Sequence, residues 1–347
     1  MSTTNSLYAP FHDVGFKAHD VKIPSPAHDP TLDLTIHALV FEPESPAQHT
    51  LLLLHGHPQS NLIWLRAAPK LVAELKGTTR IIIPDLRGHG KSTAVSVERD
   101  EKGQYKDEVA RGRYTKREMA RDMVELVKAV GGHEKFYILA HDRGARVAHR
   151  LSLDYPESVH SLLILDIAPT VDVYLNTDLR FALYYWHWFF LVQPHPIPEQ
   201  MILGAPQAYI KKMTVMNQKG GVHGGEEEVH PKEILESYTK TLQDPAYVEA
   251  TCEDYRQSSP LGLDFEHDKE SRAKGQKVQA PFRVLWGANG IVENLYGREK
   301  QLAFWRGCCE RLDEEGSKAV PSGHYIPEEL PDTVVESALD FFKLTLK

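Results

Sequence analysis

Short apolar runs that alternate with amphipathic stretches are the main pattern of the chain. The most apolar runs, Leu51–Leu54 and Ile81–Ile83, contain no polar residue and fit strands buried on both faces of a sheet. This alternation favours an α/β fold with a largely parallel sheet joined by right-handed crossovers. The predicted strands span Leu34–Phe41, Thr50–Leu54, Arg80–Pro84, Phe136–Ala140, Leu162–Leu165, Phe282–Trp286 and Lys318–Val320. The predicted helices span Trp64–Leu75, Lys116–Val130, Ala145–Tyr155 and Asp332–Leu344.

The regular alternation stops after Ile167 and resumes near Ala280. The segment between them is aromatic and helical in spacing, and Pro and Gly divide it into short helices. We interpret it as a helical cap inserted into the α/β core. The predicted limits are 1–169 for the first part of the core, 170–279 for the cap and 280–347 for the second part of the core.

Composition and charge narrow the class of protein. The 347 residues are 41% hydrophobic and 25% charged, which is typical of one large globular domain with an insertion. The formal net charge of −8 comes from interspersed residues of both signs, and this disfavours binding to nucleic acids or to anionic membranes. The charged run Glu98–Arg113 predicts a solvated surface loop, with an active-site lid as the alternative.

Cysteine usage and the apolar runs indicate a cytoplasmic protein. Three cysteines, of which Cys308 and Cys309 are adjacent, do not make a disulfide framework and are expected to be free thiols. The segment Met1–Pro10 has no pattern of a secretory signal, and the apolar run Phe181–Val192 is too short to span a bilayer. The 18 histidines show no zinc-type spacing, so we expect neither a metal nor another cofactor.

Asp142 is the candidate nucleophile. It follows the β-rich run Phe136–Ala140 and precedes Gly144 and a predicted helix, which is the context of a nucleophile elbow. A carboxylate is ionised at neutral pH and can displace a leaving group from saturated carbon, forming an ester. The alternative is that Asp142 only caps the following helix.

Two backbone amides are expected to form an oxyanion hole beside Asp142. His57 lies in the loop after the strand Thr50–Leu54, and Arg143 directly follows the nucleophile. In elbow-type hydrolases these two positions supply the donors. A catalytic base at the His57 ring is the rival interpretation.

The order of residues along the chain places the base and its acid. His324 follows the last predicted strand, where the catalytic histidine is expected, and would deprotonate the water that cleaves the ester. The turn Trp286–Gly290 contains no carboxylate. Asp166, at the end of Leu162–Leu165, is therefore the predicted partner of His324, with Glu293 as the alternative.

Arg143 and Arg146 lie three residues apart and so on one face of the predicted helix. Two guanidinium groups beside a carboxylate indicate a small anionic substrate, since their planar forks pair well with a second carboxylate. The alternative is that one arginine pairs with a core carboxylate outside the site.

In the predicted cap, His187 and Trp188 offer two N–H donors for a departing halide.

The chain resembles the haloacetate and fluoroacetate dehalogenases of the α/β hydrolase fold. The resemblance extends from about Leu34 to Phe342 and implies a mostly parallel eight-stranded sheet with a cap after the sixth strand. The residues that carry it are His55-Gly56-His57-Pro58-Gln59, His141-Asp142-Arg143-Gly144-Ala145-Arg146, Leu165-Asp166-Ile167-Ala168-Pro169, Tyr185-Trp186-His187-Trp188, Cys252-Glu253-Asp254-Tyr255-Arg256, Asp264-Phe265-Glu266-His267-Asp268-Lys269 and Ser322-Gly323-His324.

The resemblance implies roles for these residues and a homodimer. Asp142 is similar to the family's nucleophile, and Asp166 and His324 to the pair that hydrolyses the ester. Arg143 and Arg146 correspond to the clamp for the substrate carboxylate. The residues implied as halide donors are His187, Trp188 and Tyr255.

The sequence departs from the family pattern at three places. His57 stands where phenylalanine is common, and the segment at Met216 and Asn217 lacks a tryptophan that shapes the small pocket of fluoroacetate-active relatives. The stretch Gly220–Glu228 is also longer than usual. We expect a wider or more polar pocket.

Two other functions stay open. An epoxide hydrolase of this fold also uses an Asp nucleophile and a His–acid pair, but an epoxide has no carboxylate for the arginine pair. A non-catalytic or atypical protein of the same fold would not need Asp142, Asp166 and His324 together. The cap tyrosines that could protonate an epoxide oxygen are Tyr184, Tyr185, Tyr209 and Tyr255.

Overall fold

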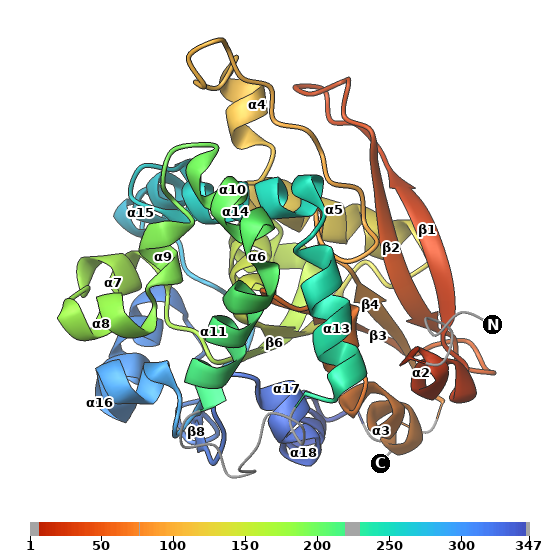
Figure 1. Ribbon diagram of the computed structural model, residues 1–347. Coiled ribbons are helices and arrows are strands. Elements are labelled where there is room, and N and C mark those ends of the chain that lie inside the picture. The colour runs from red at the N-terminus through yellow and green to blue at the C-terminus, as the bar shows by residue number, and fades with distance from the viewer. Residues whose placement is uncertain (1–6, 76, 219–229, 345–347) are drawn as a thin grey trace.

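An eight-stranded sheet forms the centre of the molecule (Figure 1). The computed structural model describes residues 7–75, 77–218 and 230–344, without the side chains of residues 215–218. The strand order is β1-β2-β4-β3-β5-β6-β7-β8. The strands are β1 (Lys17–Ile23), β2 (Leu34–Phe41), β3 (His49–Leu54), β4 (Thr79–Pro84), β5 (Phe136–His141), β6 (Val159–Leu165), β7 (Phe282–Gly287) and β8 (Lys318–Val320).

The sheet is mostly parallel, as predicted. Strands β3 to β8 pair in parallel with their neighbours, while β2 runs antiparallel to both β1 and β4. Strand β1 was not predicted because it lies at the edge of the sheet, where only Ile23 of its seven residues is buried. Its sequence therefore carries no apolar run.

The four predicted core helices are present with shifted ends, and the structure adds helices that were not predicted, of which Ile291–Cys308 is the longest. Helix α6 begins at Asp142, three residues before the predicted start at Ala145, and the predicted helix Trp64–Leu75 is divided into η1 and α3. Helix α5 packs against α6, and α18 packs against α3. The helices outside the cap are α2 (Ala9–Asp13), η1 (Asn61–Trp64), α3 (Ala67–Glu74), α4 (Glu108–Gly112), α5 (Lys116–Ala129), α6 (Asp142–Asp154), η2 (Pro156–Ser158), α16 (Ile291–Cys308), α17 (Ile326–Glu329) and α18 (Pro331–Phe342).

Between β6 and β7 the described chain is helical, so the expected insertion after the sixth strand is present. Figure 1 shows its helices α9, α10, α11, α13 and α14 gathered in front of the sheet. The domain limits at residues 169 and 279 stay predictions. The helices are α7 (Thr170–Leu175), α8 (Leu179–Tyr184), α9 (His187–Phe190), α10 (Ile197–Gly204), α11 (Pro206–Gln218), α13 (Lys232–Thr241), α14 (Pro245–Ser258) and α15 (Leu263–Ala273).

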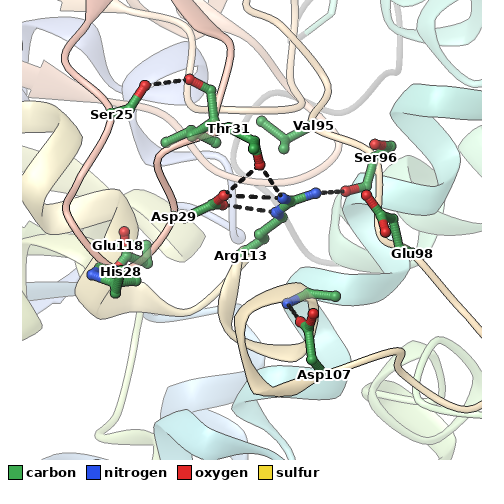
Figure 2. Close-up of polar contacts among 12 residues, drawn as sticks. Ser25, His28, Asp29, Thr31, Val95, Ser96, Glu98, Asp107, Arg113 and Glu118 are labelled. Carbon is green, nitrogen blue, oxygen red and sulfur yellow. Dashed lines mark hydrogen bonds and ion pairs between the residues drawn. The ribbon is translucent and has the colours of Figure 1, made fainter.

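Many residues of the charged segment Glu98–Arg113 are exposed, as predicted, but Glu108–Gly112 forms helix α4 and not a loop. Buried ion pairs hold the segment at two points. Arg113 donates hydrogen bonds of 2.8 and 3.1 Å to the carboxylate of Asp29 in the β1–β2 connection (Figure 2). Arg99 pairs with Glu253 of cap helix α14. The segment therefore joins the N-terminal strands to the cap.

Three further expectations concern the whole chain. Cys252, Cys308 and Cys309 are buried free thiols, as predicted. Within the described ranges, no helix has the length and apolar character that a membrane crossing requires. The described residues also contain no group of three or more His, Cys, Asp or Glu side chains arranged to hold a metal ion.

Candidate active site

Asp142 occupies a sharp turn between β5 and α6. Its φ of 46° lies in the left-handed region, which non-glycine residues rarely adopt outside functional sites. A Cβ on Gly144 would lie 2.3 Å from the backbone oxygen of His55, so only glycine allows α6 to approach β3 this closely. The turn therefore has the geometry of a nucleophile elbow.

The loop after β3 holds the Asp142 carboxylate from one side. The His57 amide donates a 3.0 Å hydrogen bond to Asp142 Oδ1, so this carboxylate does not serve as a side-chain cap of α6. A Cβ on Gly56 would lie 2.5 Å from the Asp142 Cβ, which explains the glycine there. The His57 ring turns instead toward the cap, where Nε2 lies 2.9 Å from the Tyr209 hydroxyl. Burial, together with the nearby His187, lowers the pKa of His57 to about 3, so its ring is neutral.

His324 and Asp166 form a buried pair. The His324 Nδ1 lies 2.5 Å from Asp166 Oδ2. The other oxygen of Asp166 accepts a 2.8 Å hydrogen bond from the amide of Gly287, which fixes the plane of the carboxylate. Glu293, the alternative acid, accepts a hydrogen bond from the Trp286 indole instead. The structure thus brings Asp166, and not Glu293, to the histidine.

The charges around Asp142 keep it ionised. Burial by itself raises the pKa of this carboxyl, but His324, His141, Arg143 and Arg146 outweigh burial and lower the pKa well below its usual range. For His324, burial lowers the pKa, while the hydrogen bond and charge of Asp166 and the charge of Asp142 raise it above the ordinary value. His324 Nε2 lies 3.9 Å from Asp142 Oδ2, beyond hydrogen-bond distance.

The loop that carries His324 is held by Glu329 and His141, which no pattern in the sequence indicated. Glu329 accepts hydrogen bonds of 2.6 Å from the Gly323 amide and 2.9 Å from the Tyr325 amide. The ring of His141 lies 2.8 Å from the backbone oxygen of His324. The backbone is therefore bonded on both sides of the histidine.

Protein groups hold both arginines, and each arginine keeps a buried nitrogen that has no hydrogen-bond partner among the described residues. Arg143 donates from Nε and Nη2 to the Asp254 carboxylate at 2.7 and 2.8 Å, and Nη2 also bonds to Ser258 at 2.6 Å. Arg146 donates from Nη1 to Thr170 at 2.8 Å. Among the described residues, Arg143 Nη1 and Arg146 Nε are buried and have no hydrogen-bond partner. A core carboxylate thus pairs with Arg143, as in the alternative considered above, without using all its donors.

Asp254 is itself held from the core, and neither it nor its partner was singled out from the residues. Lys116, at the start of α5, is buried and pairs with Asp254 through Nζ. The Lys116 amide donates a 2.8 Å hydrogen bond to Asp264. These contacts join α5, α14 and α15 beneath Arg143. Asp254 and Asp264 do stand in the motifs of the family resemblance, which is the one signal that could have found them.

The predicted halide donors meet above the arginines. The rings of His187 and Trp188 on α9 lie 5.7 and 6.2 Å from the ring of Tyr255 on α14. The guanidinium carbon of Arg143 lies 4.2 Å from the Tyr255 ring, and that of Arg146 lies 4.7 Å from the Trp188 ring. Burial lowers the pKa of His187 to about 3, so this ring is neutral and carries one N–H. All five of these side chains are buried.

The predicted widening of the pocket depends on residues near the end of α11. The side chains of Met216 and Asn217 lie outside the described residues, and so does the stretch Gly220–Glu228. The prediction therefore stays a prediction.

Comparison with known proteins connects this geometry to a family. A sequence profile of the alpha/beta hydrolase fold matches residues 49–201. A fluoroacetate dehalogenase from Burkholderia sp is 34% identical over 89% of this chain and 90% of its own length. The chain belongs to the fluoroacetate dehalogenase family of the α/β hydrolase fold. A solved alpha/beta hydrolase structure from Nostoc sp PCC 7120 superposes with a TM-score of 0.79 at 34% identity, covering 96% of this chain and 99% of the other.

The chain is also similar to epoxide hydrolases. A soluble epoxide hydrolase from Corynebacterium sp. (strain C12) is 28% identical over 85% of this chain and 90% of its own length. Membership of the family makes this chain a hydrolase.

Proposed function

We propose that the protein is a hydrolytic dehalogenase of short 2-haloalkanoates. The observation that carries the proposal is the pair of unused donors, Arg143 Nη1 and Arg146 Nε, buried near Asp142. Buried polar groups rarely stay unpaired in a resting protein, and a substrate carboxylate would satisfy both at once. A carboxylate bound there brings its α-carbon to the nucleophile.

The first half-reaction is a displacement at carbon. Asp142 Oδ1 is occupied by the His57 amide, which leaves Oδ2 to attack. A bond forms between Oδ2 and the α-carbon while the carbon–halogen bond breaks, and the halide leaves with the bonding electrons. His187, Trp188 and Tyr255 surround the position where its charge develops, so their N–H and O–H groups stabilise the leaving halide.

The second half-reaction hydrolyses the ester. Water adds to Cγ of Asp142 and gives its proton to His324 Nε2, and negative charge develops on Oδ1 against the amides of His57 and Arg143. Collapse breaks the ester C–O bond and releases the alkoxide, which takes the proton back from His324 and leaves as a 2-hydroxy acid. The remaining proton of the water dissociates from the Asp142 carboxyl group into solvent, which restores the carboxylate. Esterification also removes the Asp142 charge, one of the causes that raise the pKa of His324. The pKa then falls, and His324 becomes available as a base when it is needed.

Epoxide hydrolysis is the second candidate, because relatives with that activity are similar over most of the chain. His187 and Tyr255 could donate a proton to an epoxide oxygen in the place assigned here to the halide. The unused guanidinium donors favour the haloacid, since a neutral epoxide would leave them buried and unpaired.

The test compares the two substrate classes on the same purified protein. Chloroacetate, fluoroacetate and styrene oxide are supplied separately, and halide release and diol formation are measured. We expect halide and glycolate from a haloacetate and little diol from styrene oxide. Fast diol formation without halide release from either haloacetate would overturn the proposal.

A substitution tests the proposed carboxylate clamp. Arg146→Lys keeps the positive charge but lacks the Nε donor, and we expect the KM for chloroacetate to rise about 10- to 100-fold. Arg306→Lys changes a half-exposed arginine of α16 and serves as the matched control, with KM unchanged. Equal KM values in the two variants would remove Arg146 from the substrate site.

A further inference from the structure

We infer that Tyr209, on cap helix α11, is a positioning residue for ester hydrolysis. The Tyr209 hydroxyl holds the His57 ring, and the backbone amide of His57 faces the oxyanion that develops on Asp142. The inference rests on the proposed function and assigns to the cap a part in the second half-reaction in addition to halide binding.

The contacts form a continuous chain from the cap to the nucleophile. The Tyr209 hydroxyl lies 2.9 Å from His57 Nε2, and the His57 amide lies 3.0 Å from Asp142 Oδ1. His57 is 1% exposed and Tyr209 is 6% exposed, so water does not compete for either bond. Burial raises the pKa of Tyr209, which stays a neutral phenol, and the His57 ring is neutral too. Among the described residues, the hydrogen bond to Tyr209 is therefore what orients the His57 ring. The orientation of the ring in turn helps to fix the position of the His57 backbone amide.

Other cap tyrosines hold the residues that follow His57. The Tyr247 hydroxyl of α14 donates a 3.3 Å hydrogen bond to the backbone oxygen of Pro58. Gln59 donates a 3.1 Å hydrogen bond to Glu328, whose other oxygen accepts a 3.0 Å bond from Tyr238 of α13. The loop that supplies the oxyanion donor is thus bonded directly to the cap helices α11 and α14, and through Glu328 of α17 to α13. Tyr209 is the contact nearest to the donor.

The two half-reactions need the His57 amide to different extents. During displacement the Asp142 carboxylate loses negative charge, so a donor on Oδ1 does not stabilise the transition state more than the ground state. During hydrolysis Oδ1 gains a full negative charge, and a well-placed donor lowers that barrier. Loosening the amide therefore slows hydrolysis selectively. A purely structural role of Tyr209 would not separate the steps.

Rapid-quench kinetics with chloroacetate separate the steps. Tyr209→Phe removes only the hydroxyl, and His57→Phe removes the ring nitrogens but keeps the amide. We expect first-turnover chloride release within about twofold of wild type and ester hydrolysis slowed on the order of tenfold, because removing an oxyanion donor altogether costs about 100- to 1,000-fold. Each variant should show a chloride burst of one per site and a mass increase on the Asp142 peptide.

A double variant and a control complete the design. If Tyr209 acts through His57, the double variant is no slower than either single one. Tyr155→Phe changes a partly buried tyrosine at the C-terminal end of α6, the end away from Asp142, and should match wild type. Equal slowing of both steps, no slowing, or additive effects of the two substitutions would overturn the inference.

Failure of the proposed function gives a different result. If the wild type releases no halide, the same comparison is made with styrene oxide, which also forms an ester on Asp142. Selective slowing of diol release in Tyr209→Phe would then support the positioning role without the dehalogenase. A wild type that forms no ester from either substrate would overturn both.

Discussion

His324 Nδ1 lies 2.5 Å from Asp166 Oδ2, so the acid that orients the histidine comes from the end of β6. Strand β7 contributes the amide of its last residue, Gly287, which donates to the second oxygen of Asp166. This arrangement keeps the proton on Nδ1 and leaves Nε2 free to accept one from water.

Replacement of this acid should stop ester hydrolysis and spare displacement. Asp166→Asn can present an amide N–H to Nδ1 and favour the wrong tautomer, so we expect kcat to fall about 1,000-fold or more. Chloride release in the first turnover should stay near the wild-type rate. Glu293→Gln is the matched control, because its carboxylate bonds to Trp286 and not to the histidine. A large loss in the control with none in Asp166→Asn would contradict the assignment.

The two steps should also differ in pH dependence. The pKa of Asp142 is lowered well below its usual range, so the carboxylate stays ionised. The rate of chloride release in the first turnover should therefore stay constant from about pH 5 to about pH 9. Hydrolysis needs neutral His324, whose protonated form is populated as pH falls. The steady-state rate should therefore decline toward acid pH while the burst does not, as measured by rapid quench across the range. A burst that declines together with the steady-state rate would disagree with this assignment.

Asp254 is predicted to act on substrate binding through Arg143. Asp254→Asn removes the charge that fixes Nε and Nη2 of Arg143, so Nη1 is no longer held in place. We expect KM for chloroacetate to rise about tenfold with a smaller change in kcat, together with a loss of stability of about 3–5 kcal/mol for a broken buried pair. Steady-state kinetics and urea denaturation measure the two effects. Unchanged KM in a folded variant would exclude the positioning role.

Gly56 should tolerate no side chain. The Cβ of Gly56→Ala would lie 2.6 Å from Asp142 Oδ1, so the carboxylate must move. Since displacements near 1 Å can cost about 100-fold in rate, we expect first-turnover chloride release to fall by at least about that factor. Gly307→Ala in α16, where a Cβ meets no atom within 4 Å, is the control and should keep full activity. Similar rates in the two variants would mean that the contact is not decisive.

The strands that are buried on both faces were predictable, because burial requires an apolar sequence. Runs such as Leu51–Leu54 lie inside the sheet and must be apolar on both faces, so their composition shows them. Strand β1 (Lys17–Ile23) lies at the edge of the sheet with its polar residues exposed, so its sequence has no apolar run.

The same distinction holds for the site. The positions of Asp142, Asp166 and His324 follow from the order of strands and turns. The Lys116–Asp254 pair does not, because it depends on how the cap docks on α5 across a long stretch of chain. Local sequence patterns do not predict how the cap packs against α5.

A single turnover in ¹⁸O-labelled water tests most directly whether Asp142 forms a covalent ester. Enzyme in excess over chloroacetate is allowed one turnover, and the peptide that contains Asp142 and the glycolate are analysed by mass spectrometry. We expect one ¹⁸O atom in Asp142 and none in the glycolate, because water attacks the Asp142 carbon. Label in the glycolate with none in Asp142 would show direct attack of water on the substrate and contradict the account.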